Sequence, residues 1–99
     1  MEILSILKNK VISAVEILEK QEILPSGLNK SLITIEKPKD ESFGELSTNV
    51  SMVLAKDARI KPRDLAIKIV DILKKDEIIS SGEIAGPGFI NLPILYAGL

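Results

Sequence analysis

An aromatic and an amide side chain stand two positions apart near the end of the chain, within Ala85-Gly86-Pro87-Gly88-Phe89-Ile90-Asn91. Side chains two positions apart on a β-strand lie on the same face. Phe89 and Asn91 would therefore share one face, and Ile90 would lie on the other. An aromatic ring can stack on an unstacked nucleotide base, while an amide can both donate to and accept from the base edge. The spacing makes Phe89 and Asn91 candidates for binding a base.

Phe89 could instead belong to the core or contact a protein partner. A phenylalanine on a strand is commonly a core residue. Burying Phe89 would also bury Asn91, however, and an unpaired buried amide costs about 1–3 kcal/mol. It would expose Ile90, Leu92 and Ile94 as well. The alternation therefore favours an outward Phe89, although a protein partner would account for an exposed aromatic ring as well as a base would.

The segment Gly86-Pro87-Gly88 precedes this pair. Pro87 and Gly88 suit the two central positions of a type II turn, and we expect that turn to aim Phe89 and Asn91. The segment is neither a dinucleotide fingerprint nor a phosphate-binding P-loop, because the spacing differs and no Lys-Ser/Thr pair follows.

A second group of candidates is basic: Lys56, Arg59, Lys61 and Arg63, with Asp57 as the acid among them. Such a run is commonly a solvated loop between helices. It could also contact phosphates, which position a nucleic acid without reading its sequence. Because the net charge of the chain is −1, a role of this kind must be local to the patch.

Composition excludes several classes of function. The 99 residues contain no Cys and no His, so disulfides, thiol nucleophiles, the usual zinc ligands and imidazole acid–base chemistry are absent. We expect a single domain over residues 1–99 with no catalytic residue and no metal site. No apolar run approaches the ~20 residues of a membrane span, and no signal peptide is visible. We therefore expect a cytoplasmic protein without a membrane partner.

Hydrophobic periodicity predicts the elements that position these residues. An amphipathic helix over residues 3–18 is expected to end at Pro25-Ser26-Gly27. We interpret Phe43–Val50 as a glycine turn and then a helix through about Lys56, capped by Ser47 or Thr48. A further helix opens at Pro62, and strands are expected at 32–36, 77–85 and 89–95. This order predicts a two-layer α+β domain with helices packed on one face of a small β-sheet.

Three phrases of the sequence, taken together, resemble a known family. They are FGELSTNV at Phe43–Val50, PRDLA at Pro62–Ala66 and AGPGFIN at Ala85–Asn91. In this order they resemble the N-terminal additional domain of arginyl-tRNA synthetases, and the resemblance covers nearly the whole chain. Glu45 and Leu46 depart from the family, which often has an aspartate and an aromatic residue there, and Pro93 interrupts a strand that is usually smoother.

The resemblance implies a fold of helices on a small sheet and a role in binding tRNA. The family's domain contacts the D-loop at the outer corner of tRNA and helps to select arginine tRNA, and its base-contacting aromatic and amide correspond to Phe89 and Asn91. The synthetase's catalytic domain, which would bind ATP and arginine, is absent, since a chain without His has no HIGH-like motif. We therefore expect no enzyme activity and no cofactor in this chain, whether it is a fragment or stands alone, and two partners: an arginine-accepting tRNA and that catalytic domain. The alternative is a protein-interaction or self-association module that uses the uncharged tail, residues 84–99.

Overall fold

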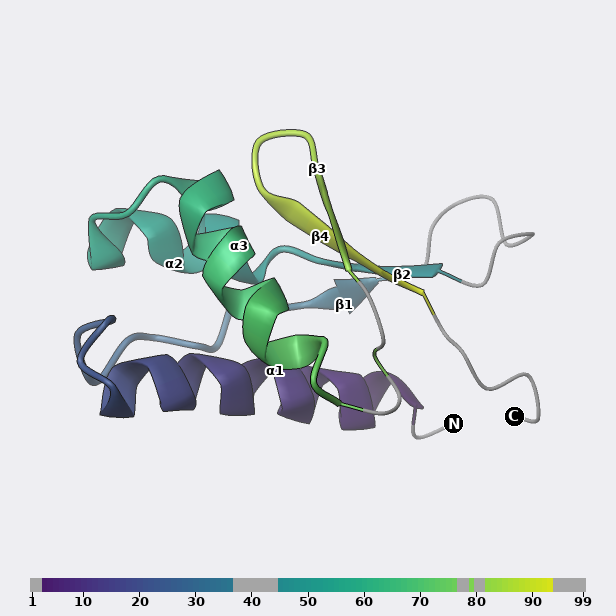
Figure 1. Cartoon of the computed structure of the whole chain (residues 1–99), viewed down its shortest axis with the longest axis horizontal. Helices are drawn as coiled ribbons and strands as arrows, with labels where there is room; N and C mark the ends of the chain where they lie inside the picture. Colours follow the sequence, from purple (N-terminus) through teal and green to yellow (C-terminus); the bar gives the residue numbers. More distant parts are fainter. Residues whose placement is uncertain (1–2, 37–44, 77–78, 80–81, 94–99) are drawn as a thin grey trace.

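The computed structural model describes residues 3–36, 45–76, 79 and 82–93. This part of the chain contains three helices and a four-stranded sheet (Figure 1). The elements in chain order are α1 (Ile3–Lys20), β1 (Ile35–Glu36), β2 (Glu45–Thr48), α2 (Val50–Ala58), α3 (Pro62–Leu73), β3 (Glu83–Ala85) and β4 (Phe89–Pro93). The α+β class predicted from the sequence is confirmed.

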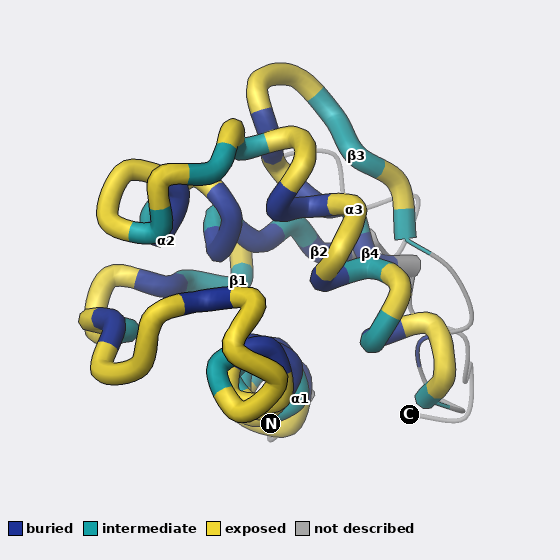
Figure 2. The backbone as a smooth tube through the Cα atoms, turned by 60° about the vertical axis from the view of Figure 1, so that its left-hand side comes forward, coloured by how far each residue is buried: buried dark blue, intermediate teal, exposed yellow. Residues whose placement is uncertain are grey.

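The sheet is antiparallel throughout, with the strand order β1-β2-β4-β3. Helix α2 packs against β4, α3 packs against β3 and β4, and α1 packs against α3 and β1. Figure 2 shows the buried stretches of the backbone gathered where the helices face the sheet. The core between these two layers includes Val11, Val15, Leu46, Leu54, Leu65, Ile69, Ile90 and Leu92, all nearly inaccessible to solvent.

Helices α1 and α3 confirm the two helices that the hydrophobic periodicity predicted. Helix α3 begins at Pro62, as predicted, because proline suits the first helical position, where its missing N–H would lack a helical partner. Helix α1 ends earlier than predicted, at Lys20 and not at Pro25-Ser26-Gly27. The chain reverses at Glu22, which has a φ of 62°, and the N–H of Ile23 donates to the carbonyl of Leu18 at 3.0 Å. That left-handed cap ends the helix before the proline.

The interpretation of Phe43–Val50 was wrong in its central part. Glu45–Thr48 forms strand β2 and not the entry to a helix, and α2 begins only at Val50. Strand β2 pairs with β1 on one side and β4 on the other, so Leu46 and Thr48 enter the core. These long-range pairs outweigh the capping tendency of Ser47 and Thr48. Residues 43–44 lie outside the described part.

Strands β1 and β3 are shorter than predicted. Strand β1 covers only Ile35–Glu36 of the expected 32–36. The described part of the 77–85 strand is β3, which begins at Glu83, and β4 ends at Pro93. The remainder of the last predicted strand and the tail after Pro93 lie outside the described residues, so the tail interface stays a prediction. Among the helices that the structure describes, none has the length and apolarity needed to cross a membrane.

Candidate nucleic-acid interface

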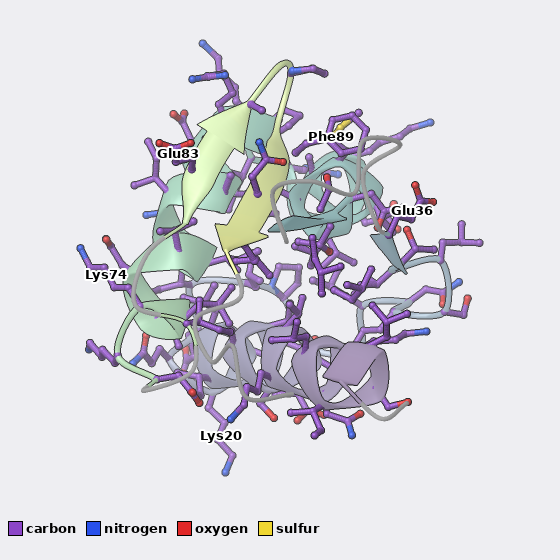
Figure 3. All side chains as sticks on the ribbon, turned by 90° about the vertical axis from the view of Figure 1, so that its right-hand side faces the viewer. Lys20, Glu36, Lys74, Glu83 and Phe89 are labelled. Atoms are coloured by element: carbon purple, nitrogen blue, oxygen red, sulfur yellow. The ribbon has the colours of Figure 1, made fainter. Side chains whose placement is uncertain are left out.

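One face of the sheet carries Phe89 and a row of polar residues, and we call it the open face. The register places Glu36, Ser47, Asn91 and Glu83 opposite one another across the four strands. Figure 3 shows this row from end to end, with Glu83 to the left of the yellow strand β4 and Glu36 and Phe89 to its right. The ring of Phe89 is 38% exposed, whereas Ile90 and Leu92 are fully buried against the helices. The outward direction predicted for Phe89 from the alternation is thus confirmed.

The turn before Phe89 differs by one residue from the prediction. The N–H of Gly88 donates to the carbonyl of Ala85 at 3.3 Å, so Gly86 and Pro87 are the two central residues, not Pro87 and Gly88. Gly86 has a φ of 56°, which a glycine adopts without steric cost. Gly88 instead lies where β4 begins, so close to Pro62 that a Cβ atom on it would be 2.8 Å from the proline Cβ. Gly88 therefore both closes the turn and packs against the start of α3.

Two side chains from the helices hold this turn in place. The hydroxyl of Ser51, which is fully buried on α2, donates to the carbonyl of Gly88. The guanidinium of Arg63, near the start of α3, donates through Nη1 to the carbonyl of Gly86. Sequence reasoning missed Ser51 altogether and predicted Arg63 only as a phosphate contact. The structure assigns Arg63 a bond to the turn, and its contact with phosphate stays a prediction.

A cavity of about 380 Å³ opens beside the ring of Phe89. Its walls come from β1, β2, the start of α2 and the segment before β1, through Thr34, Glu36, Ser47, Asn49, Met52, Val53 and Phe89. The amide of Asn49 fixes one wall, because its Oδ1 accepts from the N–H of Thr34 at 2.8 Å and its Nδ2 donates to the carbonyl of Leu32 at 3.2 Å. The residues that line the cavity therefore include an aromatic ring, a carboxylate, an amide and two hydroxyl groups.

The basic candidates lie next to this cavity. Lys56, Arg59 and Lys61 are exposed at the end of α2 and in the loop before α3. They line a second cavity of about 460 Å³, and Met52 lines both. Within the part of the chain that the structure describes, these three side chains form no salt bridge. The arrangement places positive charge beside an exposed aromatic ring, which is a combination suited to a nucleotide.

Comparison with known proteins identifies the family. The sequence profile described as "Arginyl tRNA synthetase N terminal domain" matches residues 2–94. The chain belongs to the arginyl-tRNA synthetase N-terminal domain family. The family named from the three sequence phrases is therefore confirmed.

Several relatives of this arginyl-tRNA synthetase N-terminal domain are named arginine–tRNA ligases. The protein from Nitrobacter winogradskyi is 54% identical over 77 residues, which cover 78% of this chain and 13% of the relative. The protein from Parvibaculum lavamentivorans is 45% identical over 92 residues, which cover 93% of this chain and 16% of the relative. The chain thus spans about one-seventh of the length of these curated relatives.

Proposed function

We propose that this arginyl-tRNA synthetase N-terminal domain binds tRNA through the open face of its sheet. In this proposal Phe89 stacks on an unpaired base of the D-loop, at the outer corner of the tRNA, and Asn91 forms hydrogen bonds to that base. The contact helps to select arginine-accepting tRNA for aminoacylation.

The observation that carries the proposal is an exposed ring that follows a turn held by two side-chain hydrogen bonds. Phe89 is 38% exposed beside a cavity of about 380 Å³, and the preceding turn is held by Ser51 and Arg63. Other large apolar side chains of the domain are equally exposed, but Phe89 is an aromatic residue that borders a cavity next to a cluster of cationic side chains. Every base has an apolar face that can stack on such a ring.

Asn91 supports the same role. It lies two residues from Phe89 on β4, between Ser47 on β2 and Glu83 on β3. Its amide carries two N–H donors and one carbonyl acceptor, so it can bind a base edge of either polarity. Lys56, Arg59 and Lys61 would contact the phosphates that flank the stacked base, because they surround the adjoining cavity.

In a longer synthetase, tRNA recognition and catalysis would belong to different domains. This domain would recognise tRNA without taking part in catalysis, and it would bind neither ATP nor arginine. A catalytic domain, its partner in the relatives' longer chains, would bind both and perform the reaction in the cytoplasm. Attachment to that domain would raise the effective concentration of the open face near the D-loop, which compensates for a weak single contact.

The test is a titration of the domain with an arginine tRNA transcript at low salt. Phe89→Ala should weaken binding by about 5- to 150-fold, because stacking on one base contributes about 1–3 kcal/mol. Asn91→Ala should weaken it by roughly 5-fold, the value of about one hydrogen bond. Ile67→Ala is the matched control, since Ile67 is 50% exposed on α3 and away from both cavities.

The result that would refute the proposal is equal tRNA affinity for the parent, Phe89→Ala and Asn91→Ala proteins. If Ile67→Ala weakens binding as much as Phe89→Ala does, tRNA binds on a different surface. A parallel titration with an unrelated tRNA transcript measures selection, and the parent should prefer the arginine tRNA by a margin that Phe89→Ala reduces.

A further inference from the structure

Among the residues that the structure describes, Glu36 is the one charged residue that lines the cavity beside Phe89, and we propose that it determines which bases the cavity accepts. Its carboxylate would select bases that carry an exocyclic amino group, namely adenine, cytosine and guanine, and reject uracil. This inference rests on the proposed function, since it requires that a base stacks on Phe89.

The register of the sheet puts Glu36 within reach of such a base. Glu36 pairs with Ser47, and Ser47 pairs with Asn91, so the three stand in one row of the open face. Adjacent strands lie about 4.8 Å apart, which puts Glu36 and Asn91 about 10 Å apart across β2. Both Glu36 and Ser47 line the cavity with Phe89. A base on that ring would thus have the carboxylate of Glu36 beside it in the cavity. Asn91 stands in the same row beyond Ser47, outside the residues that line the cavity.

The chemistry of a carboxylate gives the direction of the preference. An ionised carboxylate only accepts hydrogen bonds, so it attracts an amino group and repels a carbonyl oxygen. Cytosine presents an amino group where uracil presents a carbonyl oxygen. Glutamate and aspartate side chains commonly accept a hydrogen bond from that cytosine amino group. Uracil keeps one donor on this edge, N3–H, but carbonyl oxygens flank it on both sides and repel a carboxylate, so the cytosine amino group is the better partner. The two pyrimidines have the same shape, so the cavity volume cannot distinguish them.

The charge distribution gives the nucleotide one orientation. Glu36 and Glu83 occupy both ends of the polar row, and like charges there would repel a phosphate. Lys56, Arg59 and Lys61 lie on the other side of Met52, which borders both cavities. A phosphate would therefore lie toward these cationic side chains while the base edge points toward Glu36.

The experiment compares oligocytidylate with oligouridylate of equal length, titrated into the isotope-labelled chain at neutral pH and low salt and followed by NMR. The parent should bind oligocytidylate about 3- to 10-fold more tightly, less than a buried charge-assisted hydrogen bond gives, because Glu36 is exposed. Glu36→Gln should reduce the preference to below about twofold, since a glutamine amide can donate to a carbonyl as well as accept from an amino group. Glu83→Gln removes the same charge from the same face but lies outside the cavity, so it should keep the parental preference.

Equal binding of the two oligonucleotides by the parent, or an unchanged preference in Glu36→Gln, would overturn the role of Glu36. Loss of the preference in Glu83→Gln as well would also overturn it, because the effect would then come from general charge. The tRNA titration with Phe89→Ala decides the proposed function separately: an effect of Phe89→Ala without an effect of Glu36→Gln leaves the stacking site intact and refutes only the selectivity. Absence of shifts at Phe89 and Ser47 with both oligonucleotides at millimolar concentration would refute the cavity as a base site.

Discussion

Replacing Gly88 with alanine should damage the fold far more than the same change at Gly86, two residues away. An added Cβ at Gly88 would lie 2.8 Å from the Cβ of Pro62, 3.2 Å from its carbonyl carbon and 3.3 Å from Cγ of Met52. Gly88 also has a φ of 153°, which side-chain-bearing residues rarely adopt. At Gly86 the added Cβ would meet no atom within 4 Å, and the φ is 56°.

These geometries translate into different free energies of unfolding. Gly86→Ala introduces only a left-handed backbone for alanine, which costs about 1 kcal/mol. Gly88→Ala adds overpacking against a helix start to backbone strain, and each of these costs about 1–3 kcal/mol. We expect a total of about 2–6 kcal/mol for Gly88→Ala. At about 4–8 °C per kcal/mol for a domain of this size, its Tm should fall by at least about 8 °C.

Urea denaturation followed by circular dichroism measures both changes, and tRNA titration under folding conditions measures their effect on the site. Gly88→Ala should weaken tRNA binding as well, because relief of the clash moves Phe89, the next residue. Gly86→Ala serves as the matched control and should keep most of the affinity. If Gly88→Ala is no less stable than Gly86→Ala, the close approach of the turn to Pro62 is wrong, and so is the account of how Phe89 is held.

Two further predictions concern the basic loop. Arg59 caps α2 with a φ of 58°, so Arg59→Gly should raise the free energy of unfolding by up to about 1 kcal/mol while weakening tRNA binding. Glu22→Gly is the control, because Glu22 has a φ of 62° after α1 and should give similar stabilisation with unchanged affinity; equal affinity in both variants would argue against a phosphate contact at Arg59. Lys56→Ala and Lys61→Ala should each lower the slope of log affinity against log salt by about 0.7–0.9, as expected for one lost phosphate contact. Lys20→Ala, at the end of α1 and far from Phe89 in Figure 3, should leave that slope unchanged, and a slope that does not respond to either loop lysine would contradict their role.

The sequence predicted those elements whose signals are local. Helix α1 repeats apolar residues at helical spacing, α3 begins with a proline, and β4 alternates buried and exposed side chains. Strand β2 could not be predicted in this way. Its four residues, Glu45–Thr48, include two good helix caps, and what makes them a strand is pairing with β4, more than forty positions along the chain.

In the candidate site, too, the sequence predicted the features with local signals and missed those that depend on long-range contacts. The shared face of Phe89 and Asn91 follows from alternation within one strand, so the sequence predicted it. Ser51 looks like any polar helix residue until the fold brings the carbonyl of Gly88 to its hydroxyl. Glu36 comes to lie near Phe89 only because β1 and β4 flank the same strand. The bond of Ser51 joins residues 37 positions apart, and the place of Glu36 depends on the order of three strands.

The contacts that hold the open face decide whether a single stacked base can contribute any net affinity. Stacking contributes about 1–3 kcal/mol, whereas ordering the backbone of one residue costs about 1–2 kcal/mol. A mobile turn of three residues before Phe89 would therefore consume the whole gain when the base binds. The bonds from Ser51 and Arg63 to the turn, and from Asn49 to the segment before β1, fix these parts during folding. Because that entropy is already lost in the free domain, the proposed binding of a base would not lose it again, so even a weak contact would be enough to discriminate between tRNAs.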